Sequence, residues 1–139
     1  ERLTIAVSAL SVAEAAIGWT VDYTKSRRAF GQAIAEFQNT RFKLAELHAE
    51  TLAKRVFVDR CIELHLQKKL SAVDAAAAKM LAGELQVRVV DECLQFFGGY
   101  GYMLEYPIAR AYIDSRIRRI AGGSSEIMRE IISRELLAD

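Results

Sequence analysis

The chain has 139 residues, which fits a single domain and is long enough to enclose a hydrophobic core. Hydrophobic residues make up 52% of the sequence and charged residues 27%, an ordinary globular composition that excludes disorder as the main state. The formal net charge of +1 supplies no basic surface, so no nucleic-acid partner is expected. Cys61 and Cys93 form neither a CxxC motif nor a disulfide framework, which favours a reducing compartment.

The first residues of the chain carry no recognisable targeting signal. No run of 18 consecutive apolar residues occurs, so no transmembrane helix is predicted. Glu1, Arg2 and Glu14 interrupt the alanine-rich start, which lacks the basic region and clean apolar run of a signal peptide. The sequence does not start with methionine and begins inside a periodic apolar segment, so we expect a piece of a longer chain.

Helical periodicity is the main structural signal, and a single proline also favours helices. Apolar residues recur at helical spacings over residues 1–26 and 71–97, and a charged stripe at spacings of three and four predicts a helix over residues 34–68. Residues 107–119 and 124–137 predict two shorter helices, whereas no strand pattern with a hairpin signal is found. Long helices with short connections predict an all-α fold: an antiparallel four-helix bundle with a short extra helix.

The sequence offers no pattern for metal binding or nucleophilic catalysis. A di-iron bundle needs Glu-x-x-His pairs, but Ala45 and Ile62 stand three residues before His48 and His65. We therefore predict no metal site and interpret both histidines as helix-flank or core-edge residues. No Cys/His/Asp arrangement indicates a nucleophilic triad.

Two glycine-rich segments separate the later helices. Gly98, Gly99 and Gly101 follow a helix rather than a strand, so they do not form a dinucleotide fingerprint; taken alone, they are typical of a helix C-terminus. Gly122-Gly123-Ser124-Ser125 precedes the last helix, whose free N–H groups can bind an anion or simply be capped.

The order of these motifs carries a resemblance that no single motif does. The blocks are, in chain order, Arg27-x-x-Phe30-Gly31, Phe37-Gln38, Gln95-Phe96-Phe97-Gly98-Gly99-Tyr100-Gly101-Tyr102, Glu105-Tyr106-Pro107 and Gly123-Ser124-Ser125-Glu126-Ile127. In this order and spacing, over essentially the whole chain, they resemble the C-terminal domain of acyl-CoA dehydrogenases. Members of this family carry an N-terminal helical domain and a middle β-domain first. Residues 1–139 are therefore expected to be the helical bundle domain without those two domains.

The resemblance implies a function for the longer protein. It implies FAD as cofactor, a fatty acyl-CoA thioester as substrate, and α,β-dehydrogenation to the trans-2-enoyl thioester. It also implies an electron-transfer flavoprotein as electron acceptor, a homo-oligomer arranged as a dimer of dimers, and a place in the mitochondrial matrix or the bacterial cytoplasm. The isolated 139 residues are predicted to be inactive, because without the β-domain they cannot enclose the flavin ring.

The resemblance assigns cofactor contacts to two parts of the chain. It matches Arg27, with Arg28 and Phe30, to the segment that meets the FAD pyrophosphate of a partner subunit, where a guanidinium fork suits phosphate oxygens. It matches Gln38 to a flavin contact in the next helix. A later loop, Gln95 to Gly99, corresponds to a contact with the adenosine half of a partner's FAD.

A second set of matches lies around the start of the last helix. By resemblance, Ser124 and Glu126 contact the flavin there. In the earlier loop, the resemblance makes Gln95, Gly98 and Gly99 the cofactor-binding residues. Most family members have threonine at the position of Ser124, and serine keeps the hydroxyl donor and acceptor of that threonine.

The catalytic base is where this sequence departs from the common family pattern. Many members read Tyr-Glu-Gly-Thr before the last helix, and that glutamate is the base, but this sequence reads Ala121-Gly122-Gly123-Ser124. In the long-chain and isovaleryl branches the base lies on the first helix of the domain, in a Glu-Arg-Leu context that this chain has at its start. The resemblance therefore assigns the base to Glu1, and substrate contacts to Arg2 and to the backbone of Gly123. The alternative is a solvated terminal glutamate.

Three interpretations of function remain open at this point. The first is a domain of an acyl-CoA dehydrogenase, closer to the long-chain than to the isovaleryl branch. The second is a non-catalytic helical module that only assembles oligomers. The third is an acyl-CoA oxidase-type flavoenzyme, which ranks lower because such domains usually carry further C-terminal helices. The preferred acyl chain length or branching does not follow from this sequence.

Overall fold

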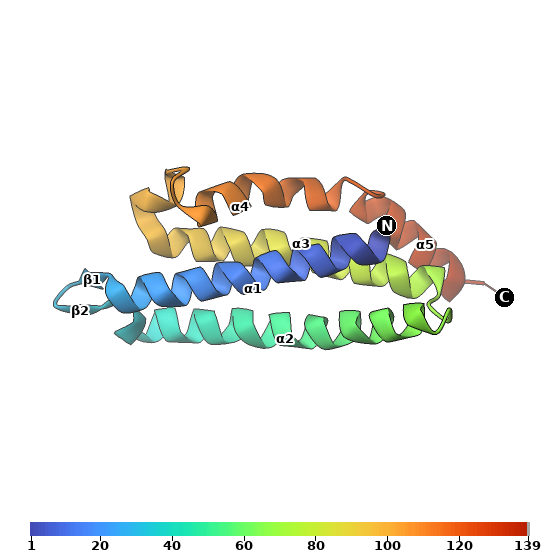
Figure 1. Cartoon of the computed structure of the whole chain (residues 1–139), viewed down its shortest axis with the longest axis horizontal. Coiled ribbons are helices and arrows are strands. Elements are labelled where there is room, and N and C mark those ends of the chain that lie inside the picture. The colour runs from blue at the N-terminus through green and yellow to red at the C-terminus, as the bar shows by residue number, and fades with distance from the viewer. Residues whose placement is uncertain (139) are drawn as a thin grey trace.

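A computed structural model describes residues 1–138 as a bundle of helices (Figure 1). Three long helices, α1 (Arg2–Ser26), α2 (Gln38–Leu66) and α3 (Ala72–Phe97), lie side by side with consecutive helices antiparallel. The fourth position is taken by α4 (Pro107–Ser115), and α5 (Ser125–Leu136) is the extra helix. The predicted all-α bundle is confirmed. The short elements between the helices are β1 (Arg28–Ala29), β2 (Gln32–Ala33) and the 3₁₀ turns η1 (Ile34–Glu36), η2 (Gly98–Tyr102) and η3 (Arg116–Arg119).

Helix α1 is the central helix of the bundle. It packs most extensively against α3, and its fully buried face is made of small and medium side chains that allow close helix approach. By length and composition alone, α1 is also apolar enough to cross a membrane, although a central core helix meets the same criterion. The fully buried residues of its inner face are Ala6, Ala9, Leu10, Ala13 and Ala16.

The core between α1, α2 and α3 includes both cysteines. Cys61 and Cys93 are buried and unbridged, as expected for small core residues. Burial raises the pKa of the Cys93 thiol to about 11. On α2, Leu47 and Val58 are among the buried core residues.

A two-stranded hairpin joins α1 to α2, and the sequence did not predict it. Strands β1 and β2 have two residues each, which is too short for an alternating pattern to be visible. The turn residues Phe30 and Gly31 both have positive φ, 51° and 84°, the geometry of a type I′ turn. The Arg28 guanidinium donates a 2.9 Å hydrogen bond to the Gly31 carbonyl and closes the hairpin tip.

Helix caps and glycines define the connections on either side of the later helices. Ser71 accepts a 2.9 Å hydrogen bond from the Asp74 N–H and so caps the start of α3. Between η3 and α5, Gly122 and Gly123 have φ of 67° and 96°, which other residues rarely adopt. This pair, called the glycine elbow below, brings the start of α5 beside the start of α1.

Candidate functional site

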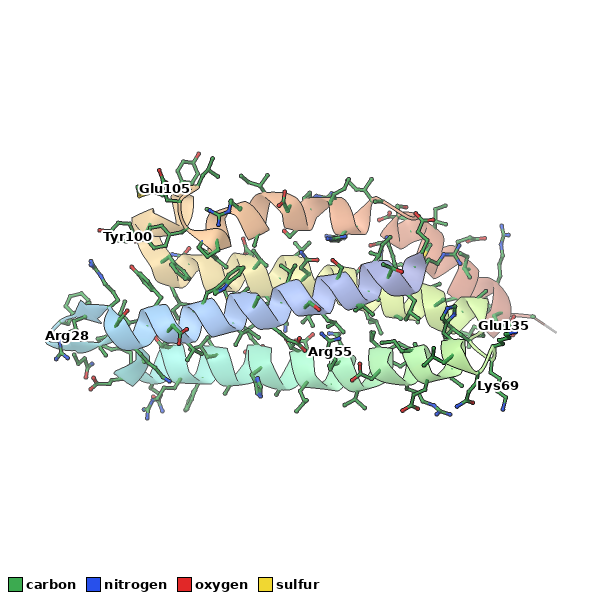
Figure 2. All side chains as sticks on the ribbon, in the orientation of Figure 1. Arg28, Arg55, Lys69, Tyr100, Glu105 and Glu135 are labelled. Atoms are coloured by element: carbon green, nitrogen blue, oxygen red, sulfur yellow. The ribbon has the colours of Figure 1, made fainter. Side chains whose placement is uncertain are left out.

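The predicted site residues fall into two groups at opposite ends of the bundle. Helix α1 has 25 residues, and at 1.5 Å per residue it separates its two ends by about 37 Å. Figure 2 shows Arg28 and Tyr100 at one end, and Lys69 and Glu135 at the other. We call the first the hairpin end and the second, which holds Glu1 and the glycine elbow, the elbow end.

At the elbow end, a surface pocket of about 420 Å³ connects the predicted base to the glycine elbow. Glu1 precedes the first turn of α1 and is exposed, with no side-chain capping bond. The pocket also reaches the loop between α2 and α3. Its lining residues are Glu1, Arg2, Leu3, His65, Leu70, Ala75 and Gly122.

The Glu1 carboxylate faces Gly122 directly. A Cβ atom added to Gly122 would lie 3.6 Å from the Oε1 atom of Glu1. The same Cβ would overlap the Cδ1 atom of Ile5, one helical turn along α1. The side-chain space of Gly122 is therefore filled by α1, with the carboxylate of Glu1 at its edge.

The start of α5 holds the other predicted residues of this end. The Ser124 hydroxyl is the N-cap and accepts a 3.4 Å hydrogen bond from the Ile127 N–H. Glu126 lies in the first turn and is exposed. Its pKa is lowered, first by a hydrogen bond from its own N–H, then by the Ser124 hydroxyl and nearby arginines.

Sequence reasoning missed one residue at this end, Lys79 of α3. Its side chain is fully buried, and its ammonium group donates a hydrogen bond to the Gly123 carbonyl. The signal was present in the sequence, because the residues three and four positions away on either side are all alanine or glycine. These small neighbours leave room for a long stem, and none is a carboxylate that could pair with the charge on the same helix.

At the hairpin end, an open pocket of about 580 Å³ is lined by several of the predicted cofactor-binding residues. Arg27 lies above the ring of Tyr100, with its guanidinium carbon 5.9 Å from the ring centroid, within cation–π range. Tyr23 stacks on Phe97 at 4.3 Å between centroids. Burial raises the pKa of Tyr23, and Arg27 opposes that effect in part. The predicted residues among the pocket's lining are Arg27, Gln95, Gly98 and Gly99.

The remaining predicted residues of this end lie outside that pocket. Phe30 is 96% exposed at the hairpin tip, with only its edge-to-face contact to Phe37. Arg28 is exposed and bonded to the hairpin turn, and Gln38 is exposed at the first position of α2.

Within residues 1–138, no group of three or more His, Cys, Asp or Glu side chains is arranged to hold a metal ion. The geometry defines a helical-bundle domain with two separate candidate ligand sites, one at each end.

Comparison with known proteins identifies the family. The family described as "Acyl-CoA dehydrogenase, C-terminal domain" matches residues 1–137. The mitochondrial long-chain specific acyl-CoA dehydrogenase of Sus scrofa is 48% identical over 139 residues, which are all of this chain and 32% of that protein. The chain therefore belongs to the acyl-CoA dehydrogenase family, and spans about a third of the length of the curated relatives it matches.

Solved structures agree with the fold. An acyl-CoA dehydrogenase from Geobacillus kaustophilus matches with a TM-score of 0.97 and 43% identity, over 99% of this chain and 36% of that one. A glutaryl-CoA dehydrogenase from Mycobacterium smegmatis, solved in complex with FADH₂, shares the fold at 23% identity with a TM-score of 0.95, over 99% of this chain and 36% of that one. The family to which the chain belongs is one of FAD enzymes.

Proposed function

We propose that this chain is the C-terminal helical domain of an enzyme that dehydrogenates fatty acyl-CoA thioesters to trans-2-enoyl-CoA with FAD. In this proposal the chain supplies the catalytic base, part of the flavin contacts and an oligomer interface. Its relatives include mitochondrial and bacterial proteins, which supports the mitochondrial matrix or the bacterial cytoplasm as its location. An electron-transfer flavoprotein is the proposed electron acceptor, on the family resemblance.

The observation that carries the proposal is that the Glu1 carboxylate borders the side-chain space of Gly122. Many family members place their base at the position that is Gly122 here, and this chain has no side chain there. The Glu1 carboxylate oxygen lies 3.6 Å from where such a side chain would begin. A carboxylate can therefore reach the same region from α1 instead of from the elbow, which supports Glu1 as the base.

The chemistry asked of Glu1 is removal of the proton from the α carbon of the thioester. A positioned carboxylate contributes to such a step by about 10²–10⁴-fold. FAD, when bound, accepts the hydride from the β carbon. Glu1 lies on the rim of a pocket, so a bound substrate would cover it and exclude water from it. Arg2, which lines the same pocket, is a cation beside the entering thioester.

The residues present also fit the cofactor, at both ends of the chain. At the hairpin end, Arg27 is an exposed cation above an aromatic floor, and Gly98 and Gly99 leave backbone accessible, which suits a phosphate and an adenosine group. At the elbow end, the Ser124 hydroxyl and the start of α5 suit polar flavin atoms. About 37 Å separates the two groups along α1, which supports contacts to two different FAD molecules in an oligomer.

An exposed apolar stripe on α2 supports the oligomeric part of the proposal. Phe42, Leu52 and Val56 are 56–63% exposed and fall within a quarter turn of one another on the helix. Exposed Ala45 and Ala49 lie between them on the same face. A continuous apolar face with small residues suits packing against a second copy of the chain. This observation also favours the alternative of an assembly module without catalysis.

The deciding experiment is Glu1→Gln in the full-length enzyme that contains this chain. We expect the variant to bind FAD and acyl-CoA normally but to lose at least a hundredfold in turnover, because the amide cannot accept the proton. Turnover is measured with an acyl-CoA and an artificial electron acceptor, and FAD content by flavin absorbance. Glu135→Gln, an exposed glutamate on α5, is the matched control. Wild-type turnover in Glu1→Gln would exclude Glu1 as the base.

A further inference from the structure

Lys79 is the one fully buried charged side chain among residues 1–138. Its neighbours on the inner face of α3 are alanines, and its ammonium group reaches the Gly123 carbonyl, 44 residues further along the chain. Burial lowers the pKa of Lys79, and nearby Arg2 lowers it further, whereas Glu126 opposes both. A buried cation is destabilising unless it is well bonded, so this lysine serves a purpose other than packing.

A second residue of α3, Gly83, also contacts the segment that leads into α5. Gly83, four residues after Lys79 and therefore on the same face of α3, allows the Arg118 backbone to come close. A Cβ atom on Gly83 would lie 3.2 Å from the Arg118 carbonyl oxygen. Lys79 thus contacts the glycine elbow, and Gly83 contacts η3, which precedes the elbow.

The side chains of Ile5 and Met128 lie against the elbow, and the Lys79 ammonium group adds a hydrogen bond to its backbone. Gly122 and Gly123 have no side chains to pack, and both adopt positive φ. The hydrogen bond from Lys79 is charge-assisted, and such bonds are stronger and shorter than neutral ones. It acts on the carbonyl between the residue that faces Glu1 and the residue that caps α5.

We propose that Lys79 is a positioning residue that fixes the glycine elbow against Glu1, and so sets the distance between the base and the substrate-contacting backbone of Gly123. The role rests on the proposed dehydrogenation, in which a small displacement of either group lowers the rate of proton removal. Lys79 itself touches neither substrate nor cofactor in this proposal. Its effect passes through the elbow.

The test is Lys79→Met in the full-length enzyme, which keeps the length of the stem and removes the ammonium group. We expect amide hydrogen exchange in residues 120–125 to become at least tenfold faster. We also expect kcat, normalised to bound FAD, to fall at least tenfold. Lys79→Arg keeps a charged donor and is expected to recover both values to within about threefold of wild type, as a bond to the elbow requires.

Two control variants separate this role from general damage. Lys69→Met makes the same substitution at an exposed site, and Leu85→Ala removes a fully buried side chain from the same helix. Neither is expected to change exchange in residues 120–125 or the normalised kcat below the unfolding temperature. If Lys79→Met is recovered unfolded, Lys79→Gln replaces it, and at least threefold faster elbow exchange is expected.

The outcomes keep the two proposals apart. Wild-type exchange at the elbow in the Lys79 variants overturns the positioning role, whatever their turnover. Faster exchange with unchanged normalised kcat overturns it as well, because the elbow would then move without affecting the reaction. Wild-type turnover in Glu1→Gln, measured in parallel, overturns the base assignment alone and leaves the exchange result standing.

Discussion

The two ends of the bundle are built in different ways. The elbow end joins residues far apart in sequence: Lys79 bonds to Gly123, and Glu1 faces Gly122. At the hairpin end, the hairpin itself is held by local contacts, such as the bond from Arg28 to Gly31, and the open pocket beside it is bordered by the stacking of Tyr23 on Phe97. Long-range contacts fix positions closely, whereas a locally held loop tolerates adjustment. We therefore expect changes at the elbow end to alter the rate of reaction, and changes at the hairpin end to alter cofactor retention.

The largest expected effect comes from removing the proposed base, and a glutamate placed at the elbow is expected to reverse part of it. Glu1→Gln is expected to lower turnover by about 10²–10⁴-fold, the usual contribution of a general base. Adding Gly122→Glu together with Ile5→Ala, which clears the overlapping Cδ1 atom, is expected to recover at least tenfold of that loss. Positive φ at Gly122 disfavours a side chain, so recovery is expected to be partial.

This design is measured by steady-state turnover at matched FAD content. Glu1→Gln with Ile5→Ala, but without the new glutamate, is the control. A triple variant no faster than this control would mean that Glu1 and Gly122 do not reach the same substrate atom.

A smaller effect is expected at the hairpin end, from Arg27→Ala in the full-length enzyme. Loss of a charge-assisted hydrogen bond costs about 1.5–3 kcal/mol, so we expect FAD to bind about 10–100-fold more weakly. The kcat of the enzyme saturated with FAD is expected to stay near wild type. Equilibrium titration of the apoenzyme measures the affinity, and Lys25→Ala, an exposed cation two residues earlier, is the control. Equal FAD affinity in wild type and Arg27→Ala would remove the phosphate role.

The same difference between local and long-range contacts decides what the sequence could predict. The helices and the glycine-rich break before the last helix follow from periodicity and local chemistry, and they are confirmed. The hairpin was missed because each strand has only two residues. The small neighbours of Lys79 were visible in the sequence, but its partner, a backbone carbonyl 44 positions away, was not.

The site residues were predicted from the order of motifs, and the structure adds how they are grouped. The predicted residues Glu1 and Arg2 line one pocket, and the predicted residues Arg27, Gln95 and Gly98 line another. Sequence order alone does not give this division, because residues 95–99 and 27 meet only when α3 and α1 pack with their ends aligned. Their roles toward FAD and substrate stay predictions.

Substitution of the apolar stripe on α2 tests the assembly without touching either end. Leu52→Glu with Val56→Glu places two carboxylates on a face that would be buried between copies, and burying an unpaired charge is strongly unfavourable. We expect at least a tenfold weaker association of subunits, measured by sedimentation at several concentrations. Leu137→Glu, at a more exposed leucine outside the stripe, is the control. An unchanged association constant would place the interface on another face.

The smallest expected effects come from two glycines with open space around them. No atom lies within 4 Å of a Cβ added to Gly18 or to Gly31, so neither alanine substitution meets a steric clash. Gly18 lies inside α1, where alanine is favoured over glycine by about 1 kcal/mol. Gly31 has a φ of 84° in the hairpin turn, where alanine is strained by about 1 kcal/mol.

We therefore expect Gly18→Ala to raise the free energy of unfolding by about 1 kcal/mol, and Gly31→Ala to lower it by a similar amount, as the backbone terms above imply. Denaturant titration of the two variants and the wild type measures both changes. Because the two substitutions are chemically identical and equally unhindered, their opposite signs isolate the backbone conformation as the cause. Changes of the same sign would mean that the hairpin turn relaxes freely, and that its positive φ angles do not constrain the position of Arg27.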